Sequence, residues 1–445
     1  MSKSSTVETQ RDCLKLIFSI FALLSSYKLQ ASSTCLTDQK IKIGPIHISG
    51  NLKTKSSVIL RELKLLPHQT VCEDQISSGI SRVKRTGLFS QVNPQLIEAD
   101  ASDIKTLSVE VVERWTTLPV LKASSGGGVS QFTLGIYDPN INGEFIEAGT
   151  QYENLAGASS GILWFKNPRL FGQDHGIDLQ YWNIKRIRVK YDQNSSSPLI
   201  KSGFLQEREK IYADYFREIS TDHVIRFSLD YNGDHFSTDF LPDDVLEKNG
   251  PNPILPTRTQ LIISKVGFEI GQVQGEPQSL EGSKVGFYFG YAQPLNSKVD
   301  PFVQGDINYN SYFALAPGWQ FAQRFLVGST STEILQYWHY LGGLDRIRGF
   351  ADNRFSGRHF GLSNSEVRYL FFQHPSLLVQ AAGFLDLTSI GDKFADLNQI
   401  HAASFGGGFR FILPKFYRFV LRLDYAKPII KNDTMNFSLG VQQFF

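Results

Sequence analysis

The sequence has little net charge and no long apolar run beyond its N-terminal region. Its 445 residues carry a formal net charge of only +2 at pH 7. Bulk charge therefore gives no reason to expect nucleic acid or another polyanion as a partner. Beyond residue 31, no window of about 18 residues is apolar throughout, which excludes a protein that crosses a membrane with helices.

The chain also lacks the local motifs of common catalytic and metal sites. Its nine histidines form no HExxH pair and no Cys/His metal spacing, and no G-x-S-x-G nucleophile elbow occurs. The glycine triplets 126–128 and 406–408 are followed neither by a helix nor by a Lys-Ser/Thr pair, so they are not phosphate loops. We therefore expect no enzyme activity, no cofactor and no metal.

The N-terminus has the pattern of a secretory signal. Residues 16–24 are apolar, follow Arg11 and Lys15, and precede small residues. This run is too short for a bilayer, which needs roughly 20 residues. The pattern predicts a signal peptide over residues 1–31, with its cleavage site left open, in preference to a buried helix.

Of the three cysteines, Cys13 would be removed with the signal peptide. Cys35 and Cys72 would remain in an oxidising compartment, where a disulfide between them is expected. The alternatives are two free thiols, or a lipid attached to Cys35.

Residues 41–114 combine helical and strand patterns. The expected order is strand, helix, helix, strand and strand, at residues 46–51, 55–63, 72–90, 91–99 and 106–114. Ile76, Ile80 and Val83 recur at helical spacing, and Gly87 ends that helix. The order β-α-α-β-β predicts a compact α+β domain.

Period-two patterns dominate residues 117–445. Within 225–231, apolar side chains alternate with Arg226, Ser228 and Asp230. A soluble sandwich would also alternate, but charges in mid-strand and aromatic residues at strand ends favour a transmembrane β-barrel with a polar lumen. At roughly 20 residues per strand and loop, the segment is long enough for about 16 antiparallel strands.

The charged positions of these strands predict which face is inward. Arg or Lys at mid-depth on the lipid side costs roughly 2–4 kcal/mol. Arg226, Arg410 and Arg422 should therefore face the lumen.

The two parts together resemble the POTRA–barrel superfamily, which includes BamA- and TamA-type insertases and FhaC-type translocases. In the α+β domain, the matching residues are Gly50-Asn51, Thr86-Gly87-Leu88-Phe89 and 109–113. In the barrel, the matching segments occur in order at 137–145, 167–172, 347–350, 365–369, 406–410 and 423–428. The terminal Phe445 resembles the C-terminal signal of outer-membrane barrels, or is simply an interfacial aromatic residue.

The resemblance gives a role to the stretch GGLDRIRGF at 342–350. In the superfamily, the loop with this RGF motif folds back into the lumen, and its arginine meets an acidic residue of the wall. The motif here consists of Ile347, Arg348, Gly349 and Phe350.

Alternation along residues 381–389 points Asp386 inward, and Glu366 faces the same way on the preceding strand. We hypothesise a latch between Arg348 and Asp386, with Glu366 as second acceptor, because guanidinium binds carboxylate in a bidentate fork. The alternative is that Arg346 and Arg348 are solvated at a hairpin tip.

The resemblance implies an outer-membrane protein assembly or translocation factor. A periplasmic POTRA domain would bind unfolded outer-membrane or secreted clients through a strand edge, the barrel in the lipid bilayer would insert or secrete them, and periplasmic proteins would be accessory partners. Room for a single POTRA domain favours a dedicated or reduced system. The alternative is a channel or lipid transporter in which the RGF loop is a plug.

Overall fold

The structure is a computed structural model that describes residues 40–441 except 99–103, 127–128, 173, 194, 297–298, 344, 432 and 434–435. The signal peptide predicted at 1–31, and also Cys35 and Phe445, lie outside the described residues. The interpretations that depend on them remain predictions. No helix among the described residues is long and apolar enough to cross a membrane.

The N-terminal domain contains a four-stranded sheet covered on one face by two helices. Its elements are β1 (Lys40–Ser49), α2 (Ser56–Leu63), β2 (Thr70–Cys72), α3 (Glu73–Arg85), β3 (Phe89–Glu98) and β4 (Ile104–Glu113). The sheet order is β2-β1-β4-β3, with β1 parallel to β4. The expected α+β domain is confirmed.

Two details of this domain differ from the expected element order. The short strand β2 was not expected, because its three residues carry no alternation and form a strand only by pairing with Lys40–Lys42 of β1. That pairing also makes β1 begin earlier than residue 46.

The core of this domain is apolar, and the helices supply one face of it. Ile59 and Leu63 of α2 and Val83 of α3 are fully buried against Leu107 and Val109 of β4. These positions recur every three or four residues in the helices and every two in the strand, as one-sided burial requires.

The glycine after β1 is required by sterics. Gly50 has φ of +83°, and a Cβ at this position would lie 2.0 Å from the carbonyl oxygen of Val111. Only glycine accepts both the backbone conformation and the close approach of β4.

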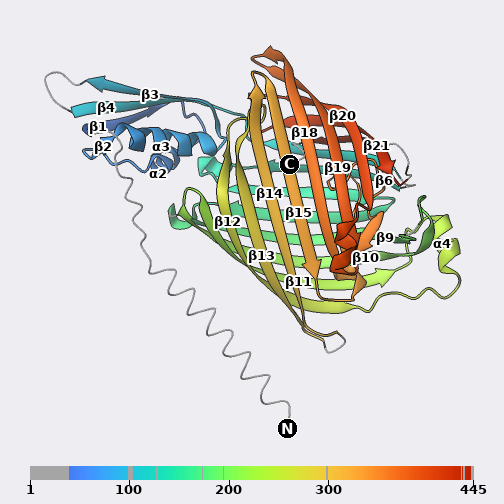
Figure 1. Ribbon diagram of the computed structural model, residues 1–445. Helices are drawn as coiled ribbons and strands as arrows, with labels where there is room; N and C mark the ends of the chain where they lie inside the picture. The colour runs from blue at the N-terminus through green and yellow to red at the C-terminus, as the bar shows by residue number, and fades with distance from the viewer. Residues whose placement is uncertain are drawn as a thin grey trace, which may run out of the picture. The chain divides into compact units, whose positions relative to one another are not determined.

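The rest of the chain forms a closed antiparallel barrel of sixteen strands among the described residues. In barrel order from the first strand these are β5 (Leu118–Gly126), β6 (Val129–Asp138), β7 (Glu147–Leu155), β8 (Ala158–Asn167), β9 (His175–Tyr191), β10 (Ile200–Ser220), β11 (His223–Ser237), β12 (Thr259–Gln274), β13 (Glu281–Pro294), β14 (Phe302–Ala316), β15 (Trp319–Thr330), β18 (His359–His374), β19 (Leu377–Gly391), β20 (Ala402–Ile412), β21 (Val420–Ile430) and β22 (Asn436–Val441). Figure 1 shows β14, β15, β18 and β19 side by side in one wall.

Short elements lie in the connections between barrel strands. They are η1 (Ile141–Gly143), η2 (Leu170–Gly172), α4 (Asp243–Asn249), η3 (Leu335–Tyr337), β16 (His339–Leu341), β17 (Phe355–Gly357) and η4 (Phe394–Asn398). Three of them, η3, β16 and β17, lie in the long connection between β15 and β18. We call this connection, residues 331–358, the lumen loop.

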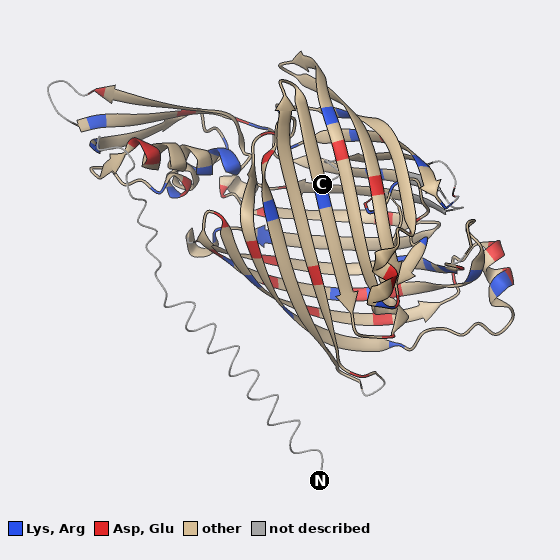
Figure 2. Ribbon diagram, in the orientation of Figure 1, with Lys and Arg blue, Asp and Glu red and all other residues tan. Residues whose placement is uncertain are grey.

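The two faces of the barrel wall have opposite character. Outward side chains such as Val266 (51% exposed) and Phe289 (59% exposed) are apolar, which suits contact with lipid. Charged residues occur in the middle of the strands as well as at their ends (Figure 2). Of the three arginines expected in the lumen, Arg226 pairs with two inner-wall carboxylates, and Arg410 and Arg422 are buried.

The barrel closes where its last strand meets its first. Among the described residues, β22 and β5 pair only at Ser438↔Ser124, Leu439↔Ala123 and Gly440↔Lys122. The other neighbouring strands pair at more positions among the described residues, from six between β21 and β22 to the long ladder from Ile200↔Tyr191 to Arg217↔His175 between β10 and β9. We call the β5–β22 junction the seam.

Candidate functional site in the barrel lumen

The lumen loop enters the barrel because its apolar residues pack on the inner wall. Ile347 and Phe350 are fully or almost fully buried, in a cluster with Leu341, Phe355 and the wall residue Phe360. Two short strands of the loop, β16 and β17, pair with each other at their base. The loop is therefore a folded hairpin held by its own core.

Tight backbone turns bring the RGF motif to the wall. Gly349 has φ of +87°, and a Cβ there would be 3.3 Å from the Cβ of Ala426 on β21. Gly342 has φ of +135°, and a Cβ there would be 2.0 Å from the carbonyl oxygen of Ala351. Both positions need glycine for the loop to fold this closely.

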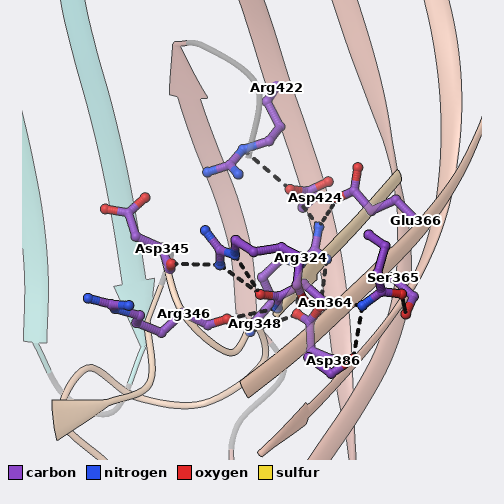
Figure 3. A network of polar contacts seen from close by, with 12 residues as sticks. Arg324, Asp345, Arg346, Arg348, Asn364, Ser365, Glu366, Asp386, Arg422 and Asp424 are labelled. Atoms are coloured by element: carbon purple, nitrogen blue, oxygen red, sulfur yellow. Dashed lines mark hydrogen bonds and ion pairs between the residues drawn. The ribbon is translucent and has the colours of Figure 1, made fainter. Parts of the chain in front are cut away.

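Arg348 lies at the centre of a buried charge cluster (Figure 3). Its Nε and Nη2 donate to the two carboxylate oxygens of Asp386 at 2.8 and 2.7 Å, and its backbone N–H donates to the same carboxylate at 3.1 Å. Its Nη1 donates to Oε1 of Glu366 at 2.5 Å. The guanidinium also stacks 3.5 Å from the ring centroid of Phe384.

The three residues predicted for the latch are therefore brought together in the lumen. Asp386 and Glu366 are each 0% exposed and Arg348 is 2% exposed. The neighbouring residues Leu385 and Val367 point to the opposite, exposed face, as strand alternation requires.

Further charges of the inner wall extend the cluster. Arg368 Nε donates to Glu366 at 2.8 Å, Arg410 Nη2 donates to Glu366 at 3.2 Å, and Arg410 Nη1 donates to Asp424 at 2.6 Å. Arg348 and Arg422 also lie within 4 Å of Asp424. Glu366 and Asp424 are thus each shared among several arginines. Removing one partner from such a buried group leaves uncompensated charge, at a cost of roughly 3–5 kcal/mol.

Asp424 and Arg410 were not predicted as members of this site. Both lie in segments that matched the superfamily, 406–410 and 423–428. Their meeting depends on the register of β20 against β21, which places Gly408 opposite Asp424. Alternation alone indicates that a residue faces inward, but not which charge it meets.

Arg346, which precedes the motif, behaves differently from Arg348. The guanidinium of Arg346 points away from the carboxylates in Figure 3, and the backbone carbonyl of Arg346 accepts a hydrogen bond from Asn364 Nδ2 at 2.9 Å. Asn364 in turn accepts from Arg324, which also donates to the carbonyl of Asp345 at 3.1 Å. Wall side chains thus hold the loop backbone at the two residues Asp345 and Arg346, which precede Arg348.

Within the POTRA domain, Cys72 is fully buried at the residue before α3. Its expected partner, Cys35, is not among the described residues. The disulfide therefore remains a prediction.

Comparison with protein families gives two matches. The POTRA family, described as a surface antigen variable number repeat, matches residues 41–114, and the Omp85 superfamily domain matches residues 176–445. The chain belongs to the Omp85 superfamily. The resemblance to the POTRA–barrel superfamily is confirmed.

Individual relatives are distant. The outer membrane protein assembly factor BamA of Nitratidesulfovibrio vulgaris is 23% identical over 396 residues, covering 81% of this chain and 45% of the relative. BamA of Neorickettsia risticii is 24% identical over 434 residues, covering 89% of this chain and 54% of the relative. The chain therefore spans about half the length of these curated relatives.

Solved structures support the fold. The structure of CdiB from Escherichia coli is similar with a TM-score of 0.66 and 12% sequence identity, covering 90% of this chain and 76% of that one. The protein described here, as a member of the Omp85 superfamily, is an outer-membrane protein whose POTRA domain is in the periplasm.

The arrangement in the lumen suits mechanical bracing. The carboxylates of Asp386 and Glu366 are occupied by guanidinium groups. Charge-assisted, bidentate contacts of this kind fix geometry. Arg348 of the lumen loop is thus in direct contact with carboxylates of the wall.

Proposed function

We propose that this chain is an outer-membrane protein assembly or translocation factor. The POTRA domain binds unfolded outer-membrane or secreted clients, and the barrel inserts or secretes them. The observation that carries this proposal is the short seam, with its three paired positions among the described residues. A barrel wall opens first between the two strands that share the fewest backbone hydrogen-bonded pairs. Opening at the seam exposes the unpaired edges of β5 and β22, and such edges are templates for an incoming strand.

The POTRA domain offers a second place for an extended client. β3 is an edge strand of its sheet, and Leu96 and Ile97 near its end are exposed at 38% and 51%. An edge strand with exposed apolar side chains binds an extended segment by strand addition.

The proposed function involves no covalent chemistry, and the free energy of client folding drives it. Arg348, Asp386 and Glu366 have the role of a latch that keeps the lumen loop in place. Periplasmic accessory proteins are proposed as further partners, because the curated relatives are named assembly factors.

A reversible cross-link tests the seam directly. Ala123→Cys together with Leu439→Cys places two thiols at a paired position of the seam. Leu423→Cys with Leu439→Cys is the matched control, because it ties β22 to β21 and leaves the seam free. Oxidation should stop client assembly in the seam pair only, and reductant should restore it. Equal activity of both oxidised pairs would refute seam opening.

Depletion of the protein identifies the class of client. We expect quantitative proteomics of the outer membrane to show loss of either many barrel proteins or one or two dedicated ones. An unchanged set of outer-membrane and secreted proteins would contradict the proposed function.

A further inference from the structure

A second buried arginine–aspartate pair contacts the lumen loop, far from Arg348. Asp234 of β11 is 1% exposed, and its carboxylate accepts from Arg208 Nε at 2.7 Å and Arg208 Nη2 at 3.0 Å. It also accepts from Gln206 at 2.8 Å and Thr259 at 3.1 Å. The fifth donor is the hydroxyl of Tyr337, at 2.7 Å, which belongs to the lumen loop.

The loop segment around Tyr337 is held by more than this hydroxyl. Arg208 Nη2 donates to the carbonyl of Gln336 at 3.0 Å, and Gln336 Nε2 donates to the carbonyl of Thr257 at 3.0 Å. The ring of Tyr337 lies 5.2 Å from that of Phe302 and 4.7 Å from the guanidinium carbon of Arg208. We call this segment, residues 334–337, the stem.

The stem and the RGF motif contact different parts of the wall. The polar partners of the stem lie on β10, β11 and β12, and its Tyr337 ring also packs against Phe302 at the start of β14. Arg348 is held by carboxylates on β18, β19 and β21. In the barrel order of the described strands, β13, β14 and β15 separate the polar partners of the stem from those of Arg348 on one side, and six strands from β22 to β9 separate them on the other. The lumen loop therefore connects nearly opposite walls.

We propose that Asp234, with Arg208, is a second anchor of the lumen loop, and that the loop braces two opposite walls of the barrel. Release of the stem and release of the RGF motif are then two separate steps. Loss of one anchor leaves the other as a tether, and the freed part rebinds at a high effective concentration. Asp234, Arg208 and Tyr337 are thus positioning residues for the loop.

The charge chemistry supports this role for Asp234. The Asp234 carboxylate can be buried because five protein hydrogen-bond donors take the place of water. Charge-assisted hydrogen bonds of this kind are roughly twice as strong as neutral ones. Four of the donors come from wall residues, so the wall alone satisfies most of the carboxylate. Tyr337 adds a bond that exists only while the stem is docked.

Amide hydrogen exchange of the full chain in lipid nanodiscs tests the proposal, because it reports opening of each segment separately. Asp234→Asn and Tyr337→Phe should each raise exchange in the stem about tenfold or more and leave 346–350 protected. Arg348→Ala should do the reverse. The double variant Asp234→Asn/Arg348→Ala should expose both segments and raise ion conductance in planar bilayers.

The matched control is Asp230→Asn. Asp230 lies on the same strand, is also 1% exposed, and pairs with the wall lysines Lys210 and Lys265 at 3.4 and 2.7 Å. If Asp234→Asn and Tyr337→Phe both leave stem exchange equal to that of Asp230→Asn, the second anchor is refuted. If Asp234→Asn alone also exposes 346–350, independence of the anchors is refuted. Tyr337→Phe keeps the test valid if Asp234→Asn fails to fold.

This inference does not rest on the proposed function. Hydrogen exchange needs no client, so a failed second anchor would leave the seam cross-link result unaffected. Conversely, if cross-linking the seam had no effect on client assembly, the hydrogen exchange expected for the lumen loop would be unchanged.

Discussion

The POTRA core and the barrel interior solve burial in opposite ways. The POTRA domain buries Ile59, Leu63 and Leu107 in an apolar cluster, whereas the largest fully buried side chains of the barrel include Arg354, Arg368 and Arg410. In the first region, burial is favourable because apolar surface leaves water. In the second, charges are tolerated because partners surround them. Mutations should therefore follow different rules in the two regions.

The largest effect is expected at the centre of the lumen cluster. Glu366→Ala would leave Arg348, Arg368 and Arg410 without their shared carboxylate. We expect a loss of about 3–5 kcal/mol in barrel stability, the cost of uncompensated buried charge. Denaturant unfolding followed by tryptophan fluorescence in detergent measures it.

The control for this charge effect is Glu333→Ala. Glu333 is 88% exposed and lies 3.8 Å from Arg358, so its removal should change stability by less than about 1 kcal/mol. Equal losses of barrel stability in Glu366→Ala and Glu333→Ala would contradict the expectation that a buried charge matters more than an exposed one.

The next largest loss of stability is expected in the apolar core of the POTRA domain. Leu63→Ala should destabilise the POTRA domain by about 2–5 kcal/mol, because Leu63 is 0% exposed and its truncation leaves a cavity. Helical circular dichroism during denaturation reports this domain. Leu66→Ala, at a site 69% exposed, should have little effect. A Leu63→Ala variant as stable as Leu66→Ala would contradict the apolar core.

A smaller effect is expected from the backbone. Gly50→Ala introduces a Cβ at a residue with φ of +83° and close to the carbonyl of Val111. Strain of this kind costs about 1–3 kcal/mol, and it should appear in POTRA unfolding only. A loss of barrel stability of similar size would show that the two regions do not respond separately.

The smallest effect is expected at the edge of the lumen cluster. Asp345 is 69% exposed and lies 3.8 Å from Lys122 of β5. Asp345→Ala should change barrel stability by about 0–1 kcal/mol, since exposed ion pairs are weak. A larger loss in the same unfolding experiment would mean that this pair fastens the loop to the first strand.

Sequence reasoning predicted the elements that depend on local pattern. Alternation along 381–389 correctly placed Asp386 on the inner face, since its neighbour Leu385 is exposed. The same reasoning missed β2, whose residues form a strand only through pairing with β1. It also gave no role to Asp234 or Tyr337, which are separated by 103 positions.

The sequence by itself determined the order of the parts, the approximate strand number and the inward face of each strand, because these follow from periodicity and length. Only the tertiary structure decided which charges meet. Arg348 binds the carboxylates whereas Arg346 does not, and Asp424 joins the cluster through the register of β20 and β21. The physical reason is that barrel closure and loop folding bring together residues from distant strands, and no local pattern encodes those distances.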